Sequence, residues 1–277
     1  MNDNPSSRPS VKAQLEAAGL RPNRKLGQNF LVDRNYLTRI AELAAEKPED
    51  AVLEIGAGLG ALTTELAASG QSITAIEIDR GLHTLLEATF SDYPNVRIVL
   101  GDILKTNIAD LYAKRNFQVI ANIPYYLTSK LIRQLLESDT RPSLIHLLVQ
   151  KEVAERACQN APKMNLLSLS IRLFGEAKKL FAVPAGAFFP VPKVDSAVLK
   201  ITPSKEPIGE PTASDLMRLA RAAFQQKRKT LLNSLSALPE WDKSEVGARI
   251  KGQDIDPGAR PQHLDIEQWL ALAKAFS

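Results

Sequence analysis

The chain has 277 residues, of which 44% are hydrophobic and 24% are charged, a composition that excludes an intrinsically disordered protein. Lys and Arg exceed Asp and Glu by 35 − 31 = 4, so basic residues are informative only where they cluster. The single cysteine excludes an intrachain disulfide, and the three histidines lack the spacing of metal ligands, so we expect no metal site.

Two further expectations concern size and location. A chain of this length predicts a main domain with a smaller second domain. The first thirty residues contain no apolar stretch of signal-peptide length, and no segment approaches the roughly 18 apolar residues that cross a bilayer. We therefore expect a cytoplasmic protein that contacts no membrane, and nothing in the sequence requires more than a monomer.

The N-terminal region combines a polar start with a short helical pattern. Residues 2–7 are poor in apolar side chains, and the helical pattern follows over residues 11–18. We expect residues 1–24 to form a flexible extension. Next, residues 35–45 repeat apolar side chains at helical spacing, and residues 51–55 form a short apolar run that predicts a buried strand.

Strands and helices then alternate along the chain. The apolar patterns predict helices over residues 61–69 and 81–90, interleaved with strands over residues 72–78, 96–100, 117–121 and 143–150. This alternation predicts an α/β fold built of parallel βαβ units. Beyond them we expect two helices and an antiparallel pair of strands at one edge of the sheet, over residues 151–159, 165–174, 176–183 and 196–202.

The C-terminal part of the chain has only helical patterns. Residues 202–212 carry three prolines and a glycine, which predicts a domain boundary. The helical patterns that follow cover residues 215–224, 227–238 and 265–276. The expected organisation is a domain of residues 25–203, a linker of residues 204–213 and a small all-helical domain of residues 214–277.

Three alternate glycines, Gly56, Gly58 and Gly60, follow the first predicted strand of the α/β domain. Glycine tolerates positive φ and lets the backbone approach a ligand closely, as in nucleotide-binding turns. An ordinary tight turn between a strand and a helix would show the same residues. The spacing G-x-G-x-G differs from the G-x-G-x-x-G of dehydrogenases, which disfavours a nicotinamide-dependent enzyme.

Acidic residues end the next two predicted strands. Glu77 lies 21 residues after Gly56, at the position where an acid accepts hydrogen bonds from ribose hydroxyls. Asp102 ends the third strand and is suited to an adenine amino group. Either acid alone could be a solvated surface residue. Because parallel strands end at one edge of the sheet, the glycine turn and both acids should converge on one ligand-binding crevice.

The fourth predicted strand ends in Asn122-Ile123-Pro124-Tyr125-Tyr126, the most specific pattern in the chain. The exocyclic amine of adenine is a poor nucleophile, because its lone pair is delocalised into the ring. The Asn122 side-chain oxygen and the Ile123 carbonyl can accept hydrogen bonds from such an amine and direct its lone pair at a methyl donor. Pro124 fixes the turn, and Tyr125 offers a stacking face for an extruded base. An ordinary turn is the alternative.

These stretches resemble the ribosomal RNA adenine N6-dimethyltransferase family, the kasugamycin-resistance methyltransferases of small-subunit ribosome assembly. The resemblance extends from Leu26 to about Asn233 and rests on residues 26–31, 54–60, 77–79, 101–102, 122–125, 150–156, 188–197 and 227–231. The chain departs from the family at Ile123 and Tyr126, where Leu and Asn are more common, and at Lys163-Met164-Asn165, which replaces a Tyr-Gly pair.

The resemblance implies a Rossmann-like class I methyltransferase domain that uses S-adenosylmethionine. The implied cofactor-binding residues are Gln28, Asn29, Leu31, Gly56, Gly58, Glu77, Ile78, Asp102, Ile103 and Asn122. The implied catalytic residues, which hold and clamp the target base, are Asn122, Pro124, Tyr125, Phe188 and Phe189. Core packing is the alternative for Phe189. The implied reaction methylates N6 of two adjacent adenosines in a hairpin loop near the 3′ end of 16S rRNA, in the small (30S) subunit or its precursor.

Basic side chains cluster in the predicted helical domain. Residues 218–233 contain no acidic residue and five basic ones, Arg218, Arg221, Lys227, Arg228 and Lys229. Such a cluster is typical of phosphate contact, although a solvated helix face gives the same pattern. We expect RNA to bind at Arg221, Lys227, Arg228 and Lys229.

Two other functions stay open at this point. A 23S rRNA adenine N6-methyltransferase that confers antibiotic resistance would have the same site residues. A ribosome-assembly checkpoint protein would use the cofactor only to stabilise its fold. The stretches over residues 188–196 and 227–231 favour the small-subunit enzyme, and the intact residues 122–125 argue against a purely non-catalytic role.

Overall fold

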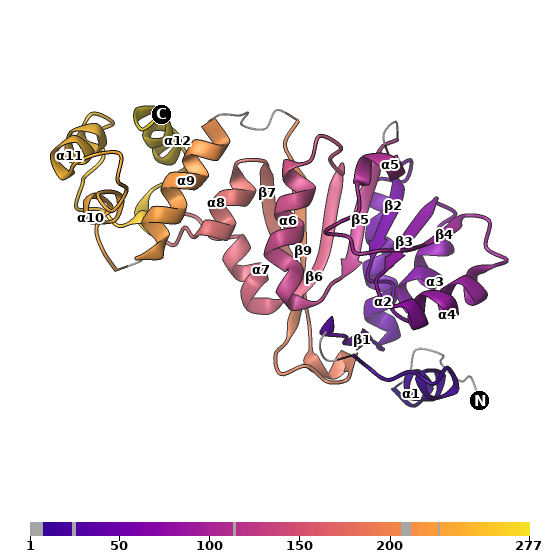
Figure 1. Ribbon diagram of the computed structural model, residues 1–277. Coiled ribbons are helices and arrows are strands. Elements are labelled where there is room, and N and C mark those ends of the chain that lie inside the picture. Colours follow the sequence, from indigo (N-terminus) through magenta and orange to yellow (C-terminus); the bar gives the residue numbers. More distant parts are fainter. Residues whose placement is uncertain (1–7, 24–25, 113–114, 206–211, 227) are drawn as a thin grey trace. The chain divides into compact units, whose positions relative to one another are not determined.

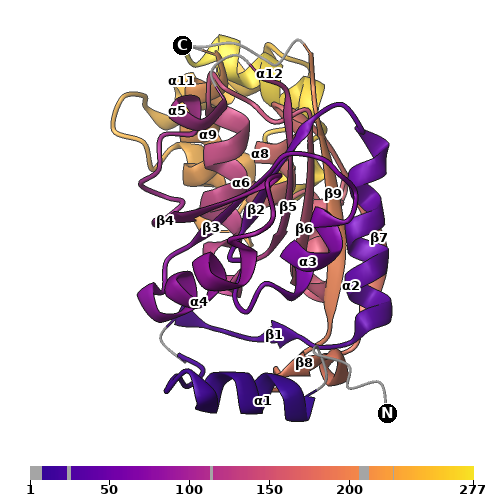
Figure 2. The ribbon, with the colours of Figure 1, turned by 90° about the vertical axis from the view of Figure 1, so that its right-hand side faces the viewer.

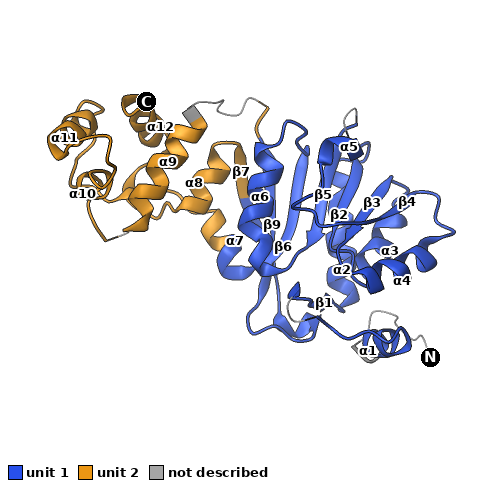
Figure 3. Cartoon of the chain, viewed as in Figure 1, with its two compact units in different colours: residues 1–154, 178–203 blue, residues 155–177, 204–277 orange. Residues whose placement is uncertain are grey.

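The computed structural model describes residues 8–23, 26–112, 115–205, 212–226 and 228–277. They form two compact units, which Figure 3 colours separately. The first unit comprises residues 1–154 and 178–203, and the second comprises residues 155–177 and 204–277. The second unit thus includes a segment, residues 155–177, that the sequence patterns assigned to the α/β domain.

Strands and helices alternate through the first unit (Figure 1). Its strands are β1 (Phe30–Leu31), β2 (Ala51–Ile55), β3 (Ile73–Glu77), β4 (Val96–Leu100), β5 (Phe117–Asn122), β6 (Leu144–Gln150), β7 (Gly175–Val183), β8 (Phe188–Phe189) and β9 (Ser196–Pro203). Its helices are α1 (Arg8–Ala17), α2 (Arg34–Ala41), α3 (Ala61–Ala67), α4 (Arg80–Phe90), α5 (Ile108–Tyr112) and α6 (Thr128–Glu137), while α7 (Lys151–Ala157) begins in this unit and ends in the second. Short 3-10 helices are η2 (Glu42–Glu46), η3 (Tyr125–Leu127) and η4 (Ala185–Ala187).

Seven strands form the main sheet in the order β4-β3-β2-β5-β6-β9-β7. Neighbours from β4 to β6 are parallel, and β9 pairs antiparallel with β6. The central strands carry near-continuous buried apolar side chains, as expected where helices cover both faces. Figure 2 shows α5 and α6 on one side of the strands and α2 on the other. The predicted α/β fold with an antiparallel addition is confirmed.

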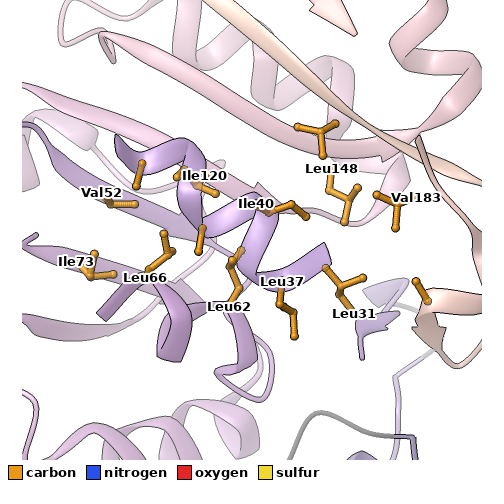
Figure 4. Close-up of a cluster of buried hydrophobic side chains, with 14 of the residues drawn as sticks. Leu31, Leu37, Ile40, Val52, Leu62, Leu66, Ile73, Ile120, Leu148 and Val183 are labelled. Atoms are coloured by element: carbon orange, nitrogen blue, oxygen red, sulfur yellow. The ribbon is translucent and has the colours of Figure 1, made fainter. Parts of the chain in front are cut away.

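The core on one face of the sheet joins α2 and α3 to the strands. Leu37 and Ile40 of α2 and Leu62 and Leu66 of α3 pack with buried residues of the strands (Figure 4). Their spacing of three or four residues places each pair on one side of its helix. This packing holds the turn between β2 and α3 at the C-terminal edge of the sheet.

The N-terminal segment contains an ordered helix where the sequence predicted a flexible extension. In α1, Val11 and Leu15 are one turn apart, and only 2% and 3% of their surfaces are exposed. They pack with Phe30, Val32 and Leu82, and Figure 2 shows α1 beside β1 and β8. The helical pattern over residues 11–18 is therefore present as α1, and the expected flexibility is wrong because Val11 and Leu15 pack on these distant apolar partners.

The second unit is helical. Its helices are α8 (Leu166–Arg172), α9 (Thr212–Gln225), α10 (Leu231–Leu235), α11 (Lys243–Lys251) and α12 (Ile266–Ala275), with a 3-10 turn η5 (Pro261–His263). Trp269 of α12 is fully buried and stacks on Phe224 of α9. Residues 155–177 join this unit because α8 packs on α9 and the Met164 amide donates to the Gln262 carbonyl, 3.1 Å away.

Two kinds of feature are absent from the described ranges. None of their helices combines the length and apolarity needed to cross a membrane. No group of three or more His, Cys, Asp or Glu side chains is arranged to hold a metal ion in this part of the chain.

Candidate active site

The glycine turn after β2 has a backbone that only glycine adopts readily. Gly56, Gly58 and Gly60 have φ values of +77°, +61° and +79°. A Cβ on Gly56 would lie 3.2 Å from the Asn122 carbonyl oxygen, and one on Gly58 would lie 3.1 Å from the Phe30 ring. The glycines therefore bring the β2 turn against the end of β5, as positive φ and close approach require.

Glu77 ends β3 as a buried carboxylate held by backbone amides. Its side chain accepts hydrogen bonds from the amides of Gly58, at 2.8 Å, and of Ile78 and Asp79, both at 2.9 Å. Burial raises the pKa of Glu77 above its ordinary value, while these hydrogen bonds act in the opposite direction. Because the donors are backbone groups, the position of the carboxylate is set before any ligand binds.

A cavity of about 270 Å³ opens at this edge of the sheet, within the first unit. Its size is close to the lower end of small-molecule sites, about 300 Å³. Every predicted cofactor-binding residue lines it: Gln28, Asn29, Leu31, Gly56, Gly58, Glu77, Ile78, Asp102, Ile103 and Asn122. The convergence that the strand-end residues predicted is therefore present in the structure.

Asp102 is only partly engaged by the protein. Its Oδ1 accepts a hydrogen bond from the Leu104 amide at 3.0 Å, and the side chain is half-buried. Within the described residues, Oδ2 has no protein partner. Beside it, Ile103 is buried and Ile78 is 46% exposed, so an apolar wall surrounds one open acceptor.

Asn122 ends β5 in an orientation that one hydrogen bond determines. Its Nδ2 donates to the Asn29 carbonyl oxygen, 3.2 Å away. Because the amide nitrogen points to Asn29, Oδ1 points elsewhere, and no described residue donates to it. The side chain is half-buried in the cavity wall. Asn122 therefore presents an acceptor without a protein donor beside the cavity.

Tyr125 is held by a residue that the sequence patterns did not single out. Its hydroxyl lies 2.9 Å from the Ser196 hydroxyl at the start of β9. Burial raises the pKa of Tyr125, so this phenol stays neutral. Pro124 and Tyr125 both line the cavity. No local pattern links residues 125 and 196; only the pairing of β9 with β6 brings Ser196 close.

The two phenylalanines of β8 have different surroundings. Phe188 is 1% exposed, pairs with Leu31 in the short β1–β8 sheet and lines the cavity. Phe189 is absent from the cavity lining and packs instead with α1 and Phe30. Phe189 therefore packs in the core, which was the alternative to a role in clamping the base. Neighbouring residues of a strand face opposite sides, so Phe188 and Phe189 cannot both face the cavity.

Glu54 of β2 is a buried carboxyl group that sequence analysis missed. It is 1% exposed, lines the cavity, and its Oε2 has no hydrogen-bond partner among the described residues. Burial raises the pKa of Glu54 to about 8, and the nearby carboxylate of Glu77 also raises it. Burial therefore favours the protonated, uncharged form of Glu54. The sequence does contain a pattern that could have identified Glu54, because it is an acidic residue within an otherwise apolar predicted strand.

The basic residues predicted to bind RNA lie in the second unit. Arg221, Arg228 and Lys229 are exposed and form no ion pair with any described residue. Lys227 lies outside the described residues. Arg218, which belongs to the same basic segment, pairs with Glu240 at 3.0 Å and donates to the Phe276 carbonyl. Arg218 therefore contributes to the fold of this unit rather than to an open basic surface.

Comparison with known proteins identifies the family. Residues 19–277 match the family model described as ribosomal RNA adenine dimethylase. The chain is 39% identical over 275 residues to ribosomal RNA small subunit methyltransferase A of Dehalococcoides mccartyi, covering 99% of this chain and 94% of the relative. The protein of that name from Moorella thermoacetica is also 39% identical, over 276 residues that cover 95% and 96% of the two chains.

Two solved structures share the fold. A dimethyladenosine transferase from Plasmodium falciparum matches with a TM-score of 0.70 and 27% identity, covering 87% of this chain and 94% of that one. The 23S rRNA methyltransferase ErmE matches with a TM-score of 0.69 and 29% identity, covering 89% and 98%. The first unit therefore has the class I methyltransferase fold, and the chain belongs to the ribosomal RNA adenine dimethylase family of methyltransferases.

Proposed function

We propose that this enzyme transfers methyl groups from S-adenosylmethionine to N6 of two adjacent adenosines in a hairpin loop near the 3′ end of 16S rRNA. The substrate is the small (30S) subunit or its precursor, and the products are dimethyladenosines. The observation that carries the proposal is Asn122, which lines the cavity and whose Oδ1 accepts no hydrogen bond from the residues that the structure describes. The names of the relatives at 39% identity support the small subunit as the substrate.

The donor set of the cavity fits S-adenosylmethionine. The Glu77 carboxylate is suited to the ribose hydroxyls, and the open oxygen of Asp102 is suited to the adenine amine. Gly56 and Gly58 leave room for the cofactor's methionine part, while Ile78 and Ile103 offer apolar contacts to its adenine ring. When bound, the cofactor supplies an electrophilic methyl group on a positively charged sulfur. Gln28, Asn29 and Leu31 would close the cavity over it.

Asn122 prepares the amine for attack by accepting a hydrogen bond. Its Oδ1 accepts from one N6 hydrogen, and the carbonyl oxygen of Ile123 accepts from the other. These contacts favour a more tetrahedral nitrogen whose lone pair points toward the methyl group. The hydrogen bond from Nδ2 to the Asn29 carbonyl prevents the amide from turning its nitrogen to the substrate. No side chain of lowered pKa is needed, because the proton leaves a nitrogen that has become cationic.

The aromatic residues hold the base during this step. Tyr125 stacks on the extruded adenine, and its bond to Ser196 fixes the plane of the ring. Phe188 closes the opposite side from β8. Pro124 keeps the turn rigid between Asn122 and Tyr125. Phe189 acts indirectly, by packing α1 against β1.

The RNA would also contact the second unit. Arg221, Lys227, Arg228 and Lys229 are proposed to bind phosphates outside the target loop. Replacing Lys227, Arg228 and Lys229 by Glu should weaken binding to small subunits and flatten its salt dependence, with unchanged cofactor affinity. Filter binding from low to high salt measures this, and a triple variant with parental binding at every salt concentration would refute the assignment.

The decisive experiment maps the modified base. The protein is incubated with labelled S-adenosylmethionine and with under-methylated small or large ribosomal subunits. We expect dimethyladenosine at two adjacent positions in 16S rRNA and none in 23S rRNA. Label in 23S rRNA alone would favour the antibiotic-resistance activity, and binding without transfer would favour a checkpoint protein. A cytoplasmic location and a monomeric state stay predictions.

A further inference from the structure

Tyr126 is an exposed aromatic residue at the mouth of the cavity. Its side chain is 59% exposed, the largest value among the big apolar side chains that the structure describes as exposed. The ring lies against the backbone of Gly27, where an added Cβ would be 3.6 Å from Cε1 and 3.7 Å from Cδ1. The ring is therefore supported at one place while most of its surface faces solvent.

Lys130 lies one helical turn beyond Tyr126. The two residues belong to the adjoining helical segments η3 and α6, and both line the cavity. A separation of four residues places side chains on the same side of a helix. Lys130 is exposed, and no acidic side chain of the described chain pairs with it. An aromatic ring and an ammonium group that pairs with no described carboxylate thus lie on one side of this segment, which follows the end of β5 where Asn122 lies.

We propose that Tyr126 and Lys130 form a subsite for the nucleotide next to the target adenosine. The Tyr126 ring stacks on an unpaired base, and the Lys130 ammonium contacts a phosphate of the same strand. Single-stranded RNA is recognised by this combination of aromatic stacking and positive charge. This inference rests on the proposed function, because it presupposes an unpaired strand entering the cavity.

A stacking subsite has a consequence for two adjacent target adenosines. Stacking uses the face of the base and leaves its N6 group without a partner. A neighbour that already carries N6 methyl groups therefore occupies the subsite as well as an unmodified one. The enzyme can then methylate either adenosine of the pair while the other lies on Tyr126, which a subsite that accepted hydrogen bonds from N6 would not allow.

The test separates RNA binding from the chemical step. Tyr126→Leu removes the ring, Tyr126→Phe keeps it, and Lys130→Gln removes the charge. Tyr93→Leu and Lys47→Gln are matched controls: Tyr93 is 41% exposed, between α4 and β4, and Lys47 lies before the N-terminal end of β2, opposite the cavity edge. KM and kcat for under-methylated small subunits are measured at saturating S-adenosylmethionine, together with cofactor affinity by calorimetry.

We expect Tyr126→Leu to raise KM for small subunits about 5- to 100-fold, with kcat and cofactor affinity near parental values. Tyr126→Phe should match the parent, because the ring carries the contact. Lys130→Gln should raise KM and reduce the salt slope of binding by about 0.7, the value for one phosphate contact on a single strand. The controls should match the parent.

Three results would overturn the subsite: a parental KM for Tyr126→Leu, equal impairment of Tyr126→Phe, or a loss confined to cofactor affinity. The last would mean that Tyr126 acts through Gly27. If the parent methylates only large subunits, the proposed function is wrong and the same comparison on large subunits decides the inference. If it methylates neither, equal affinity of the parent and Tyr126→Leu for poly(A) would overturn the subsite too.

Discussion

The polar side chains at the two ends of the cavity differ in how many hydrogen bonds they accept from the protein. At the β3 end, the Glu77 carboxylate already accepts three hydrogen bonds from backbone amides. At the β5 end, the Asn122 amide nitrogen donates to the Asn29 carbonyl, and no residue in the described ranges donates to Oδ1. Asp102 is intermediate, with one engaged oxygen and one open oxygen.

Under the proposed function, this difference separates a cofactor-binding region from a reacting region. The Glu77 carboxylate is fixed in place by three backbone amides and still has acceptor capacity, so a ligand meets a preorganised acceptor that costs little to order. An acceptor that no described residue engages forms its hydrogen bond only when the substrate amine binds. That hydrogen bond can then strengthen as charge develops in the transition state. Substitutions at the β3 end should change cofactor affinity, and substitutions at the β5 end should change the methyl-transfer rate.

The largest effect is expected for Asn122→Ala. The variant loses the acceptor that acts on the amine, and its methyl-transfer rate should fall roughly 10²–10³-fold, as for one preorganised polar contact at a reacting centre. Cofactor affinity should stay parental. Rates with labelled cofactor and calorimetry together measure this, and a variant that lost affinity but kept its rate would reverse our division of the cavity.

Glu77→Ala should produce the complementary result. Removing the carboxylate leaves the amides of Gly58, Ile78 and Asp79 without their acceptor and should weaken cofactor binding by about 1.5–3 kcal/mol. At saturating cofactor the rate should approach the parental value. Calorimetry on a variant shown to be folded by circular dichroism decides the point, and unchanged affinity would disprove the ribose role.

Glu54→Gln tests the carboxyl group that is neutral through burial rather than held by amides. The pKa of Glu54 is about 8 in the folded protein and 4.5 ordinarily, so the folded state keeps a proton that the unfolded chain releases between these values. Stability of the parent should therefore fall as pH rises from about 4.5 to 8, by at most about 1.4 kcal/mol per pH unit. Gln has no such proton, so the variant should gain stability relative to the parent over this window.

Thermal unfolding of both proteins at pH 5, 7 and 9 measures the difference. The advantage of Glu54→Gln should grow from pH 5 to 7 and be greatest at pH 9. Parallel profiles would show that Glu54 is ionised in the folded protein at neutral pH.

The smallest effect is expected for Asp102→Ala. Among the described residues, only the Leu104 amide donates to this half-buried side chain, and water can replace part of its proposed contact with an adenine edge. Cofactor binding should weaken by about 0.5–1.5 kcal/mol, less than for Glu77→Ala. Comparison of the two dissociation constants in one buffer checks the order, and a larger loss at Asp102 would contradict it.

Sequence patterns located the residues whose role depends on a local backbone. Gly56, Gly58 and Gly60 were recognisable because positive φ selects glycine, and each has it. Glu77, Asp102 and Asn122 were recognisable because parallel strands end at one edge, so their convergence followed from the alternation of strands and helices.

The rest depended on contacts between distant segments. Ser196 and the Asn29 carbonyl orient Tyr125 and Asn122 across 71 and 93 residues of chain. The order in α1 comes from Phe30, Val32 and Leu82, and residues 155–177 join the helical unit through α9. For Phe189, strand alternation in a two-residue strand decided which phenylalanine faces the cavity. None of these contacts leaves a periodic signal in the sequence.

The central claim is that Asn122 activates the target amine through Oδ1. Single-turnover methyl transfer, with mono- and dimethyladenosine resolved by mass, tests it in the parent, Asn122→Ala and Asn122→Asp. If Oδ1 activates the amine, Asn122→Ala should slow both methyl transfers at least about 100-fold. Asn122→Asp should retain part of the activity, because its carboxylate still accepts a hydrogen bond while its other oxygen faces the Asn29 carbonyl. Near-parental rates for both transfers in Asn122→Ala would contradict this role of Asn122.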